Sequence, residues 1–181
     1  MTIDFSQQVP FVVEDQQGEE LCWIAVAVSV KHHFDNASNL RQCGLVRDVL
    51  GISGPCCTGS GGVRENCDKP GRLDDALGHP SVDHLAAGTA AHANPKGGGA
   101  MPFAEIQAQI DNNLPVCAFI QWPGKNVGHF ILISGYHKAG GKQYVYVNDP
   151  LFGGGPQPYS RVVSNYNLEH GTWQFTYRLK R

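Results

Sequence analysis

The apolar residues in the first part of the chain predict helices. From residue 21 to residue 34 they occupy every side of the expected helix, which is typical of a helix buried inside the core. A second helix is expected after a cap at Asn36 or Ser38 and runs to Leu50. Gly51 then ends it, because glycine readily adopts the left-handed conformation found at helix ends.

Two shorter segments complete this helical part. Residues 73–77 indicate a short helical turn, and the Gly-rich residues 88–99 indicate a connector. A last helix is expected to begin at Pro102, because apolar residues follow it at helical spacing, and to close at Asn112.

After Leu114 the pattern changes to that of β-strands. Runs of apolar and β-branched residues separated by Pro-Gly and Gly-Gly turns predict strands at residues 116–122, 129–136, 143–148 and 172–179. Helices followed by an antiparallel sheet predict an α+β fold with the two kinds of structure segregated. We expect a single domain over residues 1–181, with a helical half at about 1–113, a sheet half at about 114–181 and a cleft between them.

Composition narrows the possible functions. The chain has 181 residues, of which 41% are hydrophobic, so it can bury one full core without help from disulfides or metal ions. It carries 14 Lys and Arg against 16 Asp and Glu, a formal net charge of -2. This balance offers no basic surface for the phosphates of a nucleic acid. We therefore expect no nucleic-acid partner.

The chain shows no signal for a membrane or for Sec-type export. Residues 1–8 have neither a basic stretch nor an apolar one, as a signal peptide would. No run approaches the roughly 18 apolar residues of a membrane-spanning helix. We expect no membrane partner.

Cys22 opens the buried helix, and this position suits a nucleophile. The partial positive charge at a helix N-terminus favours a thiolate over a thiol. Gln16, six residues earlier, carries a side-chain amide that can bind an oxyanion together with the backbone N–H of Cys22. His129 precedes an apolar run in which an imidazole is costly to bury, and Asp149 ends a predicted strand. A base and an acidic partner in this order suit a Cys-His-Asp triad.

These segments resemble those of papain-like cysteine peptidases of bacteria. The resemblance covers residues 9–152 and is greatest to the compact effector peptidases of plant pathogens and to antibacterial toxins, with bacteriocin-processing peptidases more distant. It implies a papain-like fold in which Cys22 is the nucleophile, His129 the base and Asp149 the third member of the triad. Gln16 matches the glutamine that stabilises the oxyanion in this family.

Two neighbouring residues compete for these roles. Gln17 adjoins Gln16, so a shift of one residue would reassign the oxyanion donor. Asn148 competes with Asp149, because papain itself uses an asparagine and only one of two adjacent strand residues can face the histidine. The Asp-Pro pattern of the family favours Asp149.

The chain contains six cysteines, and five need a separate explanation. Cys117 lies in an expected strand and should pack as an ordinary core residue. The other four lie in or near a Gly-rich stretch without apolar periodicity: Cys43, Cys56, Cys57 and Cys67. Two disulfides would restrain this stretch, with Cys43 bonded to one of the adjacent cysteines and Cys67 to the other. A zinc site and free thiols are the alternatives.

Several other residues have less specific interpretations. Trp122 either shields the His and Asp pair from water or packs at a strand end. The glycines of residues 97–99 lack the flanking residues of a phosphate-binding loop. The remaining histidines show no metal-ligand spacing and are expected at the surface: His32, His33, His79, His84, His92, His137 and His170. The chemistry proposed for Cys22 requires no cofactor or metal.

Together these features predict a cysteine endopeptidase that cleaves protein substrates. The resemblance implies a bacterial effector or antibacterial toxin, made in the cytoplasm and delivered by a specialised secretion system into a target cell. An immunity protein would then be a second partner, besides the protein or peptide substrate. Two alternatives stay open. One is a peptidase that removes leader peptides after a double glycine, and the other is a catalytically silent domain that binds peptides.

Overall fold

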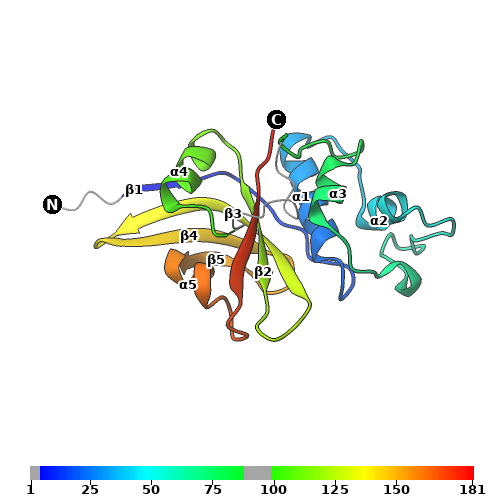
Figure 1. Cartoon of the computed structure of the whole chain (residues 1–181). Coiled ribbons are helices and arrows are strands. Elements are labelled where there is room, and N and C mark those ends of the chain that lie inside the picture. Colours follow the sequence, from blue (N-terminus) through cyan, green and yellow to red (C-terminus); the bar gives the residue numbers. More distant parts are fainter. Residues whose placement is uncertain (1–4, 88–98) are drawn as a thin grey trace.

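The fold was determined from a computed structural model that describes residues 5–87 and 99–181. The helices are α1 (Cys22–Phe34), α2 (Gln42–Leu50), the 3-10 helix η1 (Glu65–Cys67), α3 (Leu73–Gly78), α4 (Phe103–Asp111) and α5 (Tyr159–Ser164). The strands are β1 (Phe5–Gln8), β2 (Val116–Gln121), β3 (Gly128–Ala139), β4 (Lys142–Asp149), β5 (Gly153–Pro158) and β6 (Thr172–Tyr177). As Figure 1 shows, α1, α2 and α3 gather on one side and the strands on the other.

All strand pairs of the sheet are antiparallel, in the order β5-β4-β3-β2-β6. Strand β3 is long enough to pair with both β2 and β1 along one edge, and β1 aligns Gln8 with Gly135. The turn between β3 and β4 consists of Gly140 and Gly141, whose φ angles are 56° and 76°. This conformation requires positive φ at both residues, which glycine adopts without strain.

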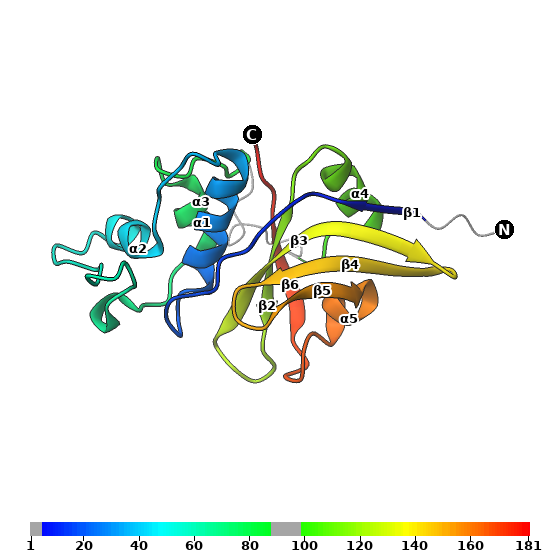
Figure 2. The same cartoon turned by 180° about the vertical axis from the view of Figure 1, so that it is seen from behind.

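Alternation along the strands divides the core into two layers, one on each face of the sheet. On one face, Phe130 and Leu132 pack with α1 and its neighbouring helices. On the other face, Ile131 and Ile133 pack with α4 and α5. Helix α1 is buried from Cys22 to Val30 and packs between the sheet and α2 and α3 (Figure 2). Its burial explains why apolar residues occupy every side of this helix.

The expected helices and strands are confirmed, and the structure adds elements that the sequence pattern did not reveal. Strand β5 has the sequence Gly-Gly-Gly-Pro-Gln-Pro, which lacks the apolar alternation of a strand. It forms because β4 offers a free edge for backbone pairing. Strand β1 and helix α5 were also not expected. The connector expected at residues 88–99 lies, except for Gly99, outside the described residues.

Two expected boundaries need correction. Helix α2 begins at Gln42, not beside Ser38, whose hydroxyl accepts the Leu40 N–H in a separate turn. Helix α4 lies before residue 113 but packs on the sheet, and β1, at the N-terminal end, is itself a strand of the sheet. The boundary expected near residue 113 therefore does not separate a helical half from a sheet half.

The four clustered cysteines form two disulfides, Cys43–Cys57 and Cys56–Cys67. This arrangement settles the pairing that the sequence left open and excludes these residues as zinc ligands or free thiols. Cys117 is fully buried in the core, as expected. Burial raises the pKa of its thiol, which keeps Cys117 protonated and unreactive.

No helix in the described part of the chain is both long and apolar enough to span a membrane.

Alanine substitutions at Gly44 and Gly171 should change the stability of the protein in opposite directions. A Cβ at Gly44, in α2, would meet no atom within 4 Å, so Gly44→Ala should stabilise the protein by about 0.5 kcal/mol through helix propensity. A Cβ at Gly171 would lie 2.4 Å from Ile120 and 2.6 Å from the Trp122 ring, so Gly171→Ala should destabilise by about 1–3 kcal/mol. Urea titration of both variants measures these changes. Equal effects would contradict the packing described here.

Candidate active site

Cys22 is the first residue of α1 and lies where the helical side meets the sheet. Its side chain is mostly buried, with 8% exposure. The first backbone N–H groups of a helix have no partner within the helix, so they point toward the space beyond its end. A negative charge formed at Cys22, or on a group bound there, would be stabilised by this helix end.

His129, near the start of β3, lies between Cys22 and Asp149. Its Nε2 is 2.7 Å from Asp149 Oδ1, which leaves Nδ1 for the thiol of Cys22. Burial disfavours the charged ring, but hydrogen bonds with Asp149 and Cys22 outweigh it and raise the pKa of His129 to about 9. At neutral pH the imidazole is therefore protonated, and Nε2–H donates to Asp149.

Asp149 is fully buried and accepts several hydrogen bonds. Besides His129, Oδ1 accepts the backbone N–H of Leu151 at 2.8 Å and that of Phe152 at 2.9 Å. The Tyr166 hydroxyl donates to Oδ2 at 2.6 Å. Burial alone would raise the pKa of Asp149, but these bonds together hold it below its usual value. The carboxylate thus stays ionised and fixes the orientation of the imidazole.

Strand alternation separates Asp149 from its neighbour Asn148. The side chain of Asn148 donates from Nδ2 to Ser134 Oγ at 2.7 Å, on the other face of the strand. Asn148 is thus not the residue paired with His129. Tyr166 was not identified from the sequence, because it comes from the segment after α5 and carries no motif.

Gln16 lies close to both sides of the site. Its backbone N–H donates to the carbonyl of Pro150, next to Asp149, at 2.9 Å. Its side-chain Nε2 donates to the carbonyls of Gly18 at 2.7 Å and Glu19 at 3.0 Å. The amide therefore has to release one of these bonds before it can donate to a substrate. Gln17, the alternative donor, is exposed.

Aromatic rings enclose the pair of His129 and Asp149. The Trp122 ring lies parallel to the imidazole, with centroids 6.1 Å apart, and also stacks on Tyr166. Phe152 meets the imidazole edge-on at 5.7 Å. Trp122 therefore packs in the core and covers the pair at the same time, so the two readings of this residue do not compete. Exclusion of water strengthens the hydrogen bond between the two charged groups.

The glycine before His129 has a packing reason. A Cβ at Gly128 would lie 2.4 Å from the carbonyl oxygen of Ile120 and 2.4 Å from the Phe119 ring. Only glycine allows the strands to approach this closely at the point where β3 carries His129.

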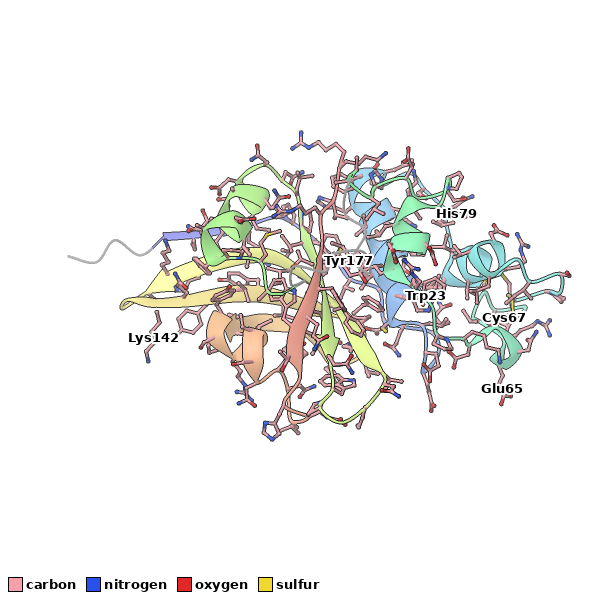
Figure 3. The ribbon with its side chains drawn as sticks, in the orientation of Figure 1. Trp23, Glu65, Cys67, His79, Lys142 and Tyr177 are labelled. Atoms are coloured by element: carbon pink, nitrogen blue, oxygen red, sulfur yellow. A yellow bond between two sulfur atoms is a disulfide. The ribbon has the colours of Figure 1, made fainter. Side chains whose placement is uncertain are left out.

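A cleft of about 190 Å³ opens beside Cys22. Its walls are mainly apolar, with Trp23 from α1 and Tyr177 from β6, both labelled in Figure 3. Glu20 also lines the cleft. The Tyr177 hydroxyl is buried and has no hydrogen-bond partner among the described residues. The remaining lining residues are Pro70, Gly71, Phe119, Asn126, Val127, Gly128 and Phe130. This cleft can accept an apolar side chain.

The other histidines need a partial correction. His170 is exposed, as expected, but five other histidines are partly buried: His32, His33, His79, His84 and His137. Burial lowers the pKa of both His33 and His84. His92 lies outside the described residues. In residues 5–87 and 99–181 no three His, Cys, Asp or Glu side chains come together as metal ligands.

The hydrogen bonds of His129 predict that stability depends on pH. Its pKa rises from 6.5 to about 9 on folding, so this stabilisation is complete below pH 6.5 and disappears as the pH passes about 9. The free energy of unfolding should fall by about 3 kcal/mol over this window. Denaturant titrations at successive pH values measure it. His129→Gln should flatten the curve, and parallel curves for the two proteins would contradict the assignment.

Comparison with solved structures found digestive procathepsin L 3 from the larval midgut of Tenebrio molitor. The TM-score is 0.54 at 14% sequence identity, and the match covers 96% of this chain and 69% of the other. At this identity the likeness shows the papain-like fold alone. A comparison with curated proteins found no match.

A family model, described as the Peptidase_C39 like family, matches residues 73–178. The matched stretch includes His129 and Asp149 and begins after Gln16 and Cys22. It covers more than half of the chain. The chain therefore belongs to the Peptidase_C39 like family and is a cysteine peptidase with a papain-like fold.

Proposed function

We propose that the protein is an endopeptidase that hydrolyses peptide bonds with a triad of Cys22, His129 and Asp149. The observation that carries this proposal is the position of His129, whose Nε2 is hydrogen-bonded to the buried Asp149 and whose pKa both Asp149 and Cys22 raise. A raised pKa on the imidazole favours an ion pair with the thiolate, which is the nucleophilic form of cysteine.

The reaction follows from these roles. The Cys22 thiolate attacks the carbonyl carbon of the scissile bond and gives a tetrahedral oxyanion. The backbone N–H of Cys22 and the side-chain amide of Gln16 stabilise this oxyanion, after the amide releases the carbonyl of Glu19. His129 protonates the leaving amine, and a thioester remains on Cys22. Water then attacks the thioester, with His129 taking its proton, and the acid is released while Asp149 holds the ring in place.

The cleft beside Cys22 favours a general endopeptidase over a peptidase specific for double glycine. In a peptidase specific for double glycine, side chains would have to fill the space next to the thiol, so that only glycine could enter. Here the space remains open and has apolar walls formed by Trp23, Phe119 and Phe130. A silent peptide-binding domain is disfavoured as well, because binding alone gives no reason for a buried ion pair at His129 and Asp149.

We also propose that the enzyme acts after export, as an effector or antibacterial toxin of bacterial origin, delivered by a specialised secretion system. The resemblance of the segments around Cys22 and His129 to such peptidases supports this role. The two disulfides support export, since disulfides persist mainly in oxidising compartments. An immunity protein that blocks the cleft would then protect the producing cell.

Labelling of Cys22 tests the chemistry. A papain-class epoxide inhibitor should modify Cys22 and leave Cys117 unmodified, because burial keeps the latter protonated. His129→Ala should reduce the labelling rate by at least a hundredfold, and Cys22→Ala should abolish turnover of peptides with the fold intact. Peptide mass spectrometry locates the adduct. Full activity in purified Cys22→Ala would end the proposal.

Substrate preference tests the use of the cleft. Peptides with a leucine shortly before the scissile bond should be cleaved at least tenfold faster, by kcat/KM, than matched peptides with glycine there. The reason is that burial of one leucine side chain contributes about 2 kcal/mol. Steady-state kinetics on the matched pair measures this ratio. Faster cleavage of the glycine peptide would support the leader-peptide alternative instead.

A further inference from the structure

The two proposed oxyanion donors stand at opposite ends of one irregular segment, residues 16–22. The Gln16 amide lies at the start of this segment and the Cys22 N–H at its end. Oxyanion donors are effective only when they are held at the right distance before the reaction begins. Residues 17–20 form bends and turns without regular structure, so the segment needs an external restraint.

The carboxylate of Asp68 supplies contacts to the middle of this segment. Its Oδ2 accepts the backbone N–H of Glu19 at 2.9 Å, and its Oδ1 accepts that of Glu20 at 2.9 Å. A Cβ at Gly18 would lie 2.4 Å from Asp68 Oδ1, so glycine is what lets the carboxylate approach. The Gln16 amide holds the same segment through carbonyls, those of Gly18 and Glu19. Asp68 thus holds the N–H groups of the segment, and the Gln16 amide holds the carbonyls of the same segment.

Asp68 is itself well anchored. It follows the buried Cys67, which is bonded to Cys56, and its backbone N–H donates to the carbonyl of Glu65 at 3.1 Å. The next residue, Lys69, accepts the indole N–H of Trp23 at 3.1 Å through its carbonyl. Figure 3 shows Cys67 with Glu65 at the outer end of the helical side and Trp23 at its inner side. The disulfide before Asp68 and the hydrogen bond to Trp23 of α1 after it therefore anchor Asp68 on both sides.

We propose that Asp68 is a positioning residue for oxyanion stabilisation. Asp68 accepts the N–H groups of Glu19 and Glu20 and thereby fixes the direction in which the chain enters α1. This direction sets the positions of the Cys22 N–H and of the Gln16 amide. This inference rests on the proposed function. Asp68 makes no contact with His129 or Asp149 among its hydrogen bonds to described residues, so it acts on the oxyanion and not on the thiolate.

This separation makes the role testable. A peptide aldehyde forms a hemithioacetal with Cys22 whose oxygen occupies the oxyanion position, so its affinity depends on the two donors. Alkylation of Cys22 by iodoacetamide needs only the thiolate, because no oxyanion forms. Loss of positioning should weaken the first reaction and spare the second, whereas general loss of structure would weaken both.

The experiment compares Asp68→Asn with wild-type protein and with Glu65→Gln. Glu65 is an exposed acid in η1, three residues before Asp68, so its variant matches the loss of charge. In Asp68→Asn, kcat for a leucine-containing peptide and the affinity of a matched dipeptidyl aldehyde should each fall at least tenfold. The reason is that one of the two accepting oxygens becomes an NH2 group, which cannot accept an N–H, and the bond that remains loses its charge. KM should change less than threefold, and the iodoacetamide rate at Cys22 less than twofold. Glu65→Gln should behave as wild type.

Gly18→Ala provides a second variant with the same expected pattern, since its Cβ displaces the Asp68 carboxylate. If kcat and aldehyde affinity stay unchanged in Asp68→Asn, the role of Asp68 is overturned. A parallel fall in alkylation would also overturn it, since the variant would then act on the whole site. Failure of the proposed function looks different, because the wild-type protein itself would then lack turnover.

Discussion

The buried carboxylate of Asp149 is the constraint on which the site depends. A charge removed from water is costly unless it is paired and hydrogen-bonded, and breaking such a pair leaves an uncompensated charge. Asp149 avoids this cost through His129 and Tyr166 and through the backbone N–H groups of Leu151 and Phe152. These partners come from β3, from the turn after Asp149 and from the segment after α5. The fold of these segments therefore stabilises the charged form of Asp149, and the charge of Asp149 in turn holds the segments together.

The junction of the helical and sheet sides is held by a few polar contacts near the thiol. The Gln16 backbone N–H binds the Pro150 carbonyl, so the segment before α1 is tied to the turn after Asp149. Within the helical side, the Lys69 carbonyl accepts the indole N–H of Trp23 and so fixes one wall of the cleft. Nucleophile and base come from different sides of the molecule, and their separation depends on these contacts.

Much of the architecture was readable from the chain. The apolar residues that surround the first part of the helix at residues 22–34 predicted its burial in the core. Continuous apolar runs predicted strands β2 and β3, and the structure buries both faces of these strands. The chemistry also left a local trace, since an imidazole at His129 beside an apolar run called for a buried partner. These features could be predicted because each depends on residues close together in sequence.

What the sequence determined by itself is the type of each element, the α+β class and the small set of side chains able to form a triad. The tertiary structure decided which of those side chains meet. Strand register turned Asn148 away from His129, and the fold of the loop after Cys67 placed Asp68 against the segment before Cys22. The partner of Asp149 from the last part of the chain, Tyr166, left no mark in the sequence. Such contacts join distant residues, and only the packing of the complete chain selects among the many that local preferences allow.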